Sequence, residues 1–112
     1  MDINETQIGG THVAGLSGRL DTSTAQSAET RLLALIGTAG ARALVVDLSG
    51  VSYVSSAGLR SLLKAAKQAQ AAGVGFALAA PQPPVREVLE ISGFDKILSI
   101  HESREAAAAK FG

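Results

Sequence analysis

Two adjacent serines, Ser55 and Ser56, stand where an apolar stretch of the sequence gives way to a run with helical spacing. A serine hydroxyl at the start of a helix accepts a hydrogen bond from a free backbone N–H group, which contributes about 1 kcal/mol. The same hydroxyl can instead carry a phosphate, which the free N–H groups and the positive end of the helix dipole would stabilise. The residues alone leave both interpretations open, a helix cap and a phosphoacceptor.

Groupings typical of enzymes are few. The two histidines, His12 and His101, lie far apart in the sequence, and both are expected at strand margins. A Ser-His-Asp triad remains formally open, but the run from Gly50 to Val54 lacks the small last residue that a nucleophile elbow needs. The sequence has no phosphate-binding glycine loop, no metal-ligand spacing and no cysteine. We therefore expect a protein that is not an enzyme, with no catalytic residue, cofactor or bound metal.

Composition limits the class of protein further. A single domain over residues 1–112 is expected, with a core of Leu, Val, Ile and Ala, because 46% of residues are hydrophobic and only 4% are aromatic. Ten basic and ten acidic residues give a net charge of zero, which removes the long-range field that a nucleic-acid-binding protein uses. We also find neither a secretory signal nor an apolar run of membrane-spanning length, and so expect a cytoplasmic protein that does not insert into membranes.

The elements that position the serine pair alternate between strand and helix. Three glycines, Gly37, Gly73 and Gly93, end predicted helices, and Ser103 is expected to cap the last one. The predicted elements are strands at 2–8 and 12–16 joined by a turn at Gly9-Gly10, a helix containing 25–36 with Asp21 or Thr22 as its cap, a strand at 43–48, a helix at about 57–72, a strand at 74–79, a helix launched by the prolines at 81–84, a strand at 97–100 and a helix at 104–110.

This order predicts an α/β fold, with a mixed sheet of about four to five strands and about four α-helices against one or both faces. The run from Ala43 to Leu48 is almost continuously apolar, which is typical of a central strand covered on both sides. Residues 50–56 are then expected at the carboxyl end of the sheet, where ligands and partners of such folds usually bind.

The stretch from Val45 to Leu63 resembles the signature region of the STAS domain, the fold shared by sulfate transporter tails and anti-sigma factor antagonists. The turn from Gly18 to Asp21 and the segment from Leu89 to Phe94 are also similar to that family. The likeness spans essentially the whole chain and agrees with the order of elements predicted above. It implies a STAS-like domain of the anti-sigma factor antagonist branch.

In that branch the pattern reads Asp-Ser-Ser/Thr-Gly-Leu, and the serine after the aspartate is phosphorylated. Aligned without a gap, Ser56 takes the place of the phosphoacceptor, and Gly58 and Leu59 match the pattern. The chain departs from the pattern at two positions, where Ser55 replaces the aspartate and Ala57 replaces the second hydroxyl residue. The resemblance also places Asp21 near the acceptor, where its charge would keep a phosphoserine exposed.

The function that the resemblance implies is partner switching. The unphosphorylated chain would bind a partner that is both an anti-sigma factor and a serine kinase, phosphorylation of Ser56 would release it, and a serine phosphatase would reverse the change. Arg60, Lys64 and Lys67 form a basic stripe that either contacts this partner or is only solvated. For Gly58 we weigh a close approach of the partner equally against a plain small residue in a first turn. The expected partner-binding residues are Asp21, Ser55, Ser56, Ala57, Gly58, Leu59, Arg60 and Lys64.

Two other functions compete with the switch. One is a constitutive scaffold or accessory subunit of a stressosome or a lipid transporter, which the replacements at Ser55 and Ala57 favour. The other is a small-molecule binder or hydrolase at the strand ends, which we rank last because no phosphate-cradling loop is visible.

Overall fold

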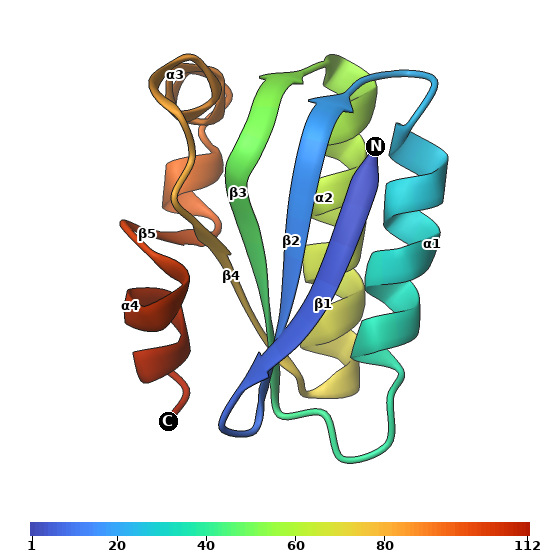
Figure 1. The fold of residues 1–112 in the computed structure, drawn as a ribbon, viewed down its shortest axis with the longest axis vertical. Coiled ribbons are helices and arrows are strands. Elements are labelled where there is room, and N and C mark those ends of the chain that lie inside the picture. The colour runs from blue at the N-terminus through green and yellow to red at the C-terminus, as the bar shows by residue number, and fades with distance from the viewer.

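Residues 1–112 are all described by the computed structural model, in which five strands and four α-helices follow one another along the chain (Figure 1). This arrangement confirms the predicted α/β fold. The elements are β1 (Asp2–Ile8), β2 (Thr11–Leu20), α1 (Ala25–Ile36), β3 (Ala43–Val54), α2 (Ser56–Ala72), β4 (Gly75–Ala79), α3 (Pro83–Ile91), the short 3-10 helix η1 (Phe94–Lys96), β5 (Ser99–His101) and α4 (Arg104–Ala109).

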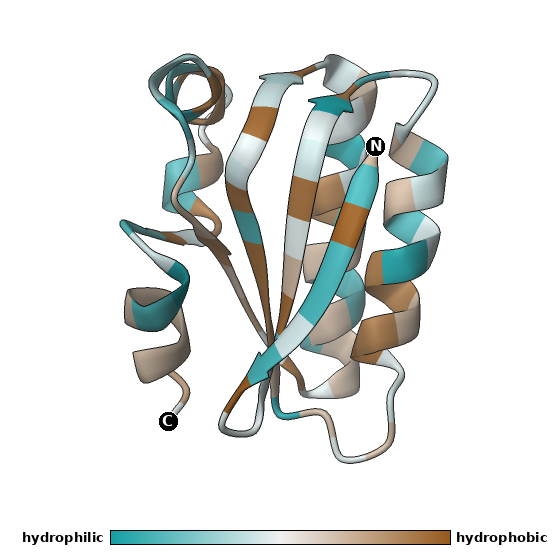
Figure 2. Ribbon diagram, in the orientation of Figure 1, coloured by the Kyte–Doolittle hydropathy of each residue, from teal (hydrophilic) through white to brown (hydrophobic).

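The strands lie side by side in the order of the sequence, from β1 to β5. β1 and β2 are antiparallel and form the predicted hairpin, whose turn Gly9 makes with a positive φ of 60°. The other neighbouring pairs are parallel, so the sheet is mixed. β1 is mainly hydrophilic, as Figure 2 shows, because it is an edge strand with most of its side chains in solvent.

The helices form unequal layers on the two faces of the sheet. α1 and α2 pack against each other on one face, and Val85 and Leu89 of α3 join the same core of 21 buried residues. On the other face, α4 covers β3, β4 and β5 over a smaller cluster that includes Val45 and Ala107. None of the helices combines the length and the hydropathy that crossing a bilayer requires.

The two central strands are longer than predicted. β2 continues beyond residue 16 to Leu20, and β3 continues beyond residue 48 to Val54. Glycines and serines in both segments suggested turns, but the two segments pair with each other across irregularities in the register, so their backbone groups are bonded. Because β4 ends level with Asp47, the carboxyl ends of β2 and β3 project beyond the rest of the sheet.

Several element boundaries also differ from prediction. Thr24, not Asp21 or Thr22, is the N-cap residue of α1, because residues 21–24 form a turn before the helix. The strand predicted at 97–100 is shortened to Ser99–His101 by η1, and α4 ends one residue early, at Ala109. The cap of α4 is confirmed, since the Ser103 hydroxyl accepts a hydrogen bond from the N–H of Ala106 at 3.0 Å.

Candidate functional site

The carboxyl ends of β2 and β3 bring two distant parts of the sequence together. Leu20 and Val54 are paired at the end of the parallel ladder, and the N–H of Ser55 donates to the carbonyl of Leu20 at 2.9 Å. Asp21 and Ser56 therefore follow two adjacent strand ends. This pairing places both residues at the same end of the sheet.

The two serines have different environments. Ser55 is half-buried in an extended conformation, and its Oγ accepts a hydrogen bond from the N–H of Gly58 at 3.2 Å, so Ser55 is the N-cap residue of α2. Ser56 is the first residue of the helix and is exposed, and its hydroxyl makes no hydrogen bond within the chain. The capping role thus belongs to Ser55, and the hydroxyl of Ser56 is left exposed to solvent.

Gly58 has a role inside the protein that the sequence did not reveal. It is buried, and a Cβ at this position would lie 2.6 Å from the carbonyl oxygen of Leu20 and 2.8 Å from its Cγ. Glycine lets the first turn of α2 approach the end of β2, so its conformational and steric freedom serves the fold. Gly58 therefore offers no surface to a partner, which corrects the expectation that its small size admits one.

Asp21 is held by the turn that precedes α1. Its Oδ1 accepts hydrogen bonds from the hydroxyl and the N–H of Ser23, at 2.7 and 3.0 Å, and from the hydroxyl of Thr24 at 3.3 Å. The hydrogen bond from the Ser23 hydroxyl is the main reason that the pKa of Asp21 is lowered. A carboxylate held by the turn therefore lies at the end of the sheet that also carries the start of α2.

The remaining predicted partner-binding residues lie along α2. Ala57 and Leu59 are half-buried, whereas Arg60 and Lys64 are exposed. Lys64 is not free, because its Nζ lies 3.1 Å from Oε2 of Glu29 on α1. Arg60 and Lys67 form no ion pair, so the basic stripe is reduced to two available cations.

The histidines do not contribute to this site. His12 lies near the amino end of β2, opposite the end that carries Asp21. His101 is level with Asp47, and so lies well before the end of β3. No three acidic or histidine side chains gather closely enough to hold a metal ion. The site therefore offers a hydroxyl, a carboxylate and backbone donors, with no histidine to act as a base.

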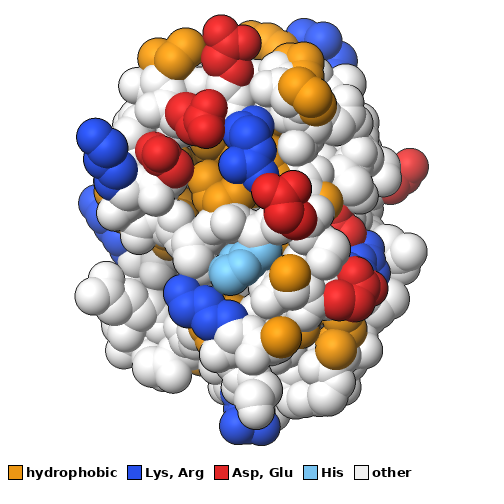
Figure 3. All heavy atoms as spheres, turned by 90° about the vertical axis from the view of Figure 1, so that its left-hand side faces the viewer, with side chains coloured by type: hydrophobic (Ala, Val, Ile, Leu, Met, Phe, Trp, Pro, Cys, Tyr) orange, Lys and Arg blue, Asp and Glu red, His pale blue; other side chains and the backbone are white.

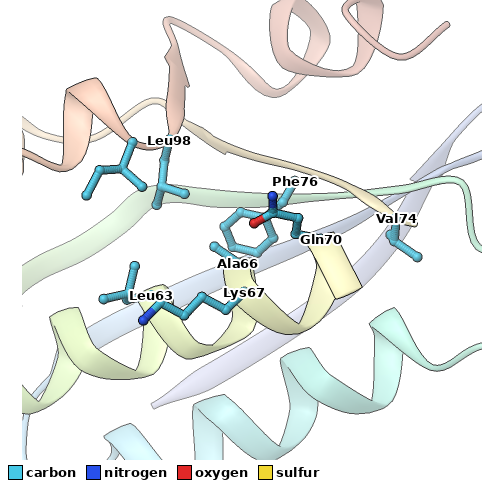
Figure 4. A pocket seen from close by; sticks show the side chains of 8 residues that line it. Leu63, Ala66, Lys67, Gln70, Val74, Phe76 and Leu98 are labelled. Atoms are coloured by element: carbon cyan, nitrogen blue, oxygen red, sulfur yellow. The ribbon is translucent and has the colours of Figure 1, made fainter. Parts of the chain in front are cut away.

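The largest cavity lies further along α2. It has a volume of about 390 Å³ between α2, β4 and η1, where Phe76 faces Leu63 and Ala66, and Lys67 is its one ionisable side chain (Figure 4). On the face formed by the C-terminal elements, acidic and basic side chains are interspersed, without a large area of one sign (Figure 3). Neither feature resembles an acid–base pair or a phosphate-binding surface.

Known proteins share the sequence pattern and the fold of this chain. The profile of the STAS domain family matches residues 2–107. This chain belongs to the STAS domain family. Over 111 residues it is 41% identical to BtrV of Bordetella bronchiseptica, which is described as an anti-sigma factor antagonist, and the match covers 99% of this chain and 95% of BtrV. This relative is named for a regulatory role, not an enzymatic one.

Solved structures of STAS proteins share the fold. The crystal structure of an anti-sigma factor antagonist from Mycobacterium paratuberculosis is 26% identical, with a TM-score of 0.89 over 98% of this chain and 92% of that one. The antagonist SpoIIAA in its unphosphorylated form is 20% identical, with a TM-score of 0.81 over 97% of this chain and 95% of that one. The phosphorylated form of Bacillus SpoIIAA has a TM-score of 0.72 at 19% identity, over 97% of this chain and 98% of that one.

Proposed function

We propose that this STAS protein is an anti-sigma factor antagonist controlled by phosphorylation of Ser56. The unphosphorylated chain binds an anti-sigma factor that is also a serine kinase, and the phosphorylated chain releases it. The proposal places both proteins in the cytoplasm. The observation that carries it is the exposed hydroxyl of Ser56, which has no hydrogen-bond partner in the chain although Ser55 beside it is fully used as a cap.

Two relatives support this proposal, one by its sequence and one by its fold. BtrV, 41% identical, is described as an anti-sigma factor antagonist. SpoIIAA, which shares the fold at low identity, exists in an unphosphorylated and a phosphorylated form. Both replacements in the motif are compatible with a switch, because Ser55 supplies the cap that an aspartate would otherwise supply, and Ala57 is not needed to hold the helix.

The chemistry needs only an accessible hydroxyl on this chain. Ser56 Oγ attacks the γ-phosphorus of ATP on the kinase, the hydroxyl proton passes to a kinase base, and ADP leaves. A serine phosphatase reverses the change by hydrolysing the phosphoester. The fold tolerates the new charge of about −1.5 to −2, because it sits at the amino end of α2.

Release of the partner then results from the interface. In this proposal the phosphate lies at the same end of the sheet as the carboxylate of Asp21, whose pKa is lowered by its hydrogen bonds with Ser23 and Thr24. Repulsion between the two negative groups favours positions in which both stay hydrated. A partner that covered Ser56 would therefore have to desolvate an unpaired phosphate. Desolvation of that kind costs several kcal/mol, enough to dissociate a complex of moderate affinity.

Substitution of Ser56 tests the switch. We expect Ser56→Ala to bind the purified anti-sigma factor at least as tightly as the wild type and to incorporate no phosphate. Ser56→Asp and Ser56→Glu should raise the Kd by about tenfold or more, because one buried, unpaired charge is worth at least 1.4 kcal/mol. Calorimetry gives the affinities, and phosphopeptide mass spectrometry gives the modified residue.

The matched control is Ser55→Ala. It should lose about 1 kcal/mol of stability because the cap is removed, yet still accept phosphate at Ser56. Equal affinities for all Ser56 variants, together with no phosphate incorporation, would contradict the switch and favour a constitutive scaffold or transporter subunit instead.

A further inference from the structure

A stacked pair of exposed side chains stands next to the phosphoacceptor end of the sheet. Arg19 on β2 and Tyr53 on β3 are paired in the parallel register, and the guanidinium carbon lies 4.3 Å from the centroid of the tyrosine ring. The side chain of Arg19 is 60% exposed, and Tyr53 is 43% exposed. The three phenylalanines are all buried or half-buried, so Tyr53 is the single exposed aromatic residue of the chain.

The guanidinium is held in place but its donors are unused. Arg19 Nε lies 3.6 Å from Oδ2 of Asp21, which is close enough for attraction between the charges but too long for a hydrogen bond. Arg19 donates no hydrogen bond within the chain. Stacking on the ring and attachment to a strand reduce its mobility, which lowers the entropy lost when another group binds.

The surroundings leave the stack accessible. β2 and β3 extend here beyond the end of β4, so no strand flanks β3 at this level. The neighbouring residues are small and exposed: Ser17, Gly18, Ser49, Gly50 and Ser52. A planar cation and an aromatic ring therefore project from an exposed, polar stretch of β2 and β3, and Arg19 is linked to Asp21 at the end of the sheet that carries Ser56.

We propose that Arg19 and Tyr53 anchor the same protein partner that reads Ser56, with Arg19 receiving a carboxylate of that partner and Tyr53 packing against an apolar side chain next to it. The inference rests on the proposed function and extends its interface across Asp21 onto the open face of β2 and β3. Arginine and tyrosine are enriched among the few residues that dominate binding energy, and a guanidinium fork matches a carboxylate with two parallel hydrogen bonds.

The pair also explains how a net-neutral chain selects its partner. With no overall field, specificity must come from local chemistry, and a guanidinium with unused hydrogen-bond donors beside a carboxylate is a directional pattern of charge. A partner that brings its acid to Arg19 must also keep that acid away from Asp21. Phosphate on Ser56 adds a further negative charge to this neighbourhood and opposes the same acid.

The test uses the full chain and the purified anti-sigma factor. We expect Arg19→Ala and Tyr53→Ala each to raise the Kd by about tenfold or more, the range of interface hot spots. Tyr53→Phe should bind like the wild type, because the ring face makes the contact. Arg19→Lys should not restore affinity, because an ammonium group cannot make the bidentate contact. The dependence of Kd on salt should also weaken in Arg19→Ala.

Lys96→Ala and Ile97→Ala are the controls, since both residues are exposed on or next to η1, and their Kd should stay within about twofold of the wild type. Thermal midpoints separate lost binding from lost folding. Unchanged affinity in Arg19→Ala and Tyr53→Ala, while Ser56→Asp still weakens binding, overturns this inference and leaves the switch intact. Weaker binding in both anchor variants, with unchanged binding in Ser56→Asp, supports this inference and contradicts the switch. A wild-type chain that does not bind the anti-sigma factor contradicts both.

Discussion

Adjacent residues of one type can have separate roles when their backbone positions differ. Ser55 precedes the helix, so its hydroxyl faces the free N–H of Gly58 and is used in capping. Ser56 lies inside the first turn, where its hydroxyl has no such acceptor role and remains in solvent. A change of one position along the chain thus separates a hydroxyl used in capping from one that is exposed and has no partner within the chain.

Gly58 is the residue whose substitution should disturb this region most. Gly58→Ala places a methyl group 2.6 Å from the carbonyl oxygen of Leu20, and such overpacking typically costs about 1–3 kcal/mol. The gain in helix propensity, about 1 kcal/mol, offsets only part of this cost. We expect a net loss in the free energy of unfolding, measured by urea denaturation.

The matched control for that substitution is Gly37→Ala, at the end of α1. Its added methyl group would lie 3.5 Å from the nearest atom, and its φ of −79° suits alanine, so its stability should be unchanged or slightly higher. Equal stabilities of the two variants would show that the first turn of α2 can move away from β2.

At the level of elements, a pair of charged residues links α4 to the sheet. The guanidinium of Arg104 lies 2.7 Å from Oδ2 of Asp47 on β3, and its Nη1 donates to the hydroxyl of Thr6 at 3.2 Å. Burial raises the pKa of Asp47, but the N–H of Ser49 and the Arg104 guanidinium together outweigh burial and lower the pKa below 3.8. A six-residue helix is too short to be stable alone, so this contact fixes it to the sheet.

Substitution of Arg104 tests how much this charged pair contributes to the stability of the fold. Arg104→Ala leaves the carboxylate of Asp47 buried and unpaired, and we expect it to lose about 2–3 kcal/mol of stability at pH 7. The control is Arg86→Ala, because the partner of Arg86 is Glu102, which is 93% exposed, and such pairs contribute at most about 1 kcal/mol. Similar losses in both variants would contradict a special role for the Asp47 pair.

Protonation of Asp47 at low pH should also remove the stabilising contact between Asp47 and Arg104. The carboxylate of Asp47 has a lower pKa in the folded chain than the 3.8 of the unfolded one, so the unfolded state takes up the proton first as the pH falls. The stability that this carboxylate contributes is complete well above pH 3.8 and decreases below it. In Asp47→Asn this part of the acid sensitivity should be absent, as measured by urea unfolding at pH 7 and at pH 3. If the stability of Asp47→Asn depends on pH as strongly as that of the wild type, the carboxylate of Asp47 does not contribute to the acid sensitivity.

The molecule as a whole has one main core that links most of its elements. The cluster of 21 buried residues includes side chains from α1, α2, α3 and the three central strands, so no large part can separate without exposing apolar surface. The upper end of β3, with the candidate site, is attached to this core through Val51 and Val54. The site therefore rests on a rigid base while its own side chains stay exposed.

Cooperative unfolding is the expected consequence. Tyr53 is the single tyrosine and there is no tryptophan, so intrinsic fluorescence reports on the end of β3 alone, whereas far-ultraviolet circular dichroism reports on all elements. The two signals should give the same urea midpoint, as in a two-state transition. A fluorescence transition at lower urea would instead show that the site unfolds locally before the core.

Local patterns were sufficient to predict the order of elements. The apolar run at 43–48, the helical spacing after Ser56, and the stops at Gly37 and Gly73 depend on neighbouring residues, and the structure contains each of them. The motif around Ser56 also indicated the family, because its residue types and spacing are local in the chain.

Contacts between distant residues were decided only by the tertiary structure. The extension of β2 and β3, the stack of Arg19 on Tyr53 and the pair between Asp47 and Arg104 join residues 33 to 57 positions apart. Their formation depends on strand register and on which face each side chain occupies, and one residue of slip would reverse that face. The need for glycine at position 58, three residues after the capping serine, is likewise settled by the packing of α2 on β2.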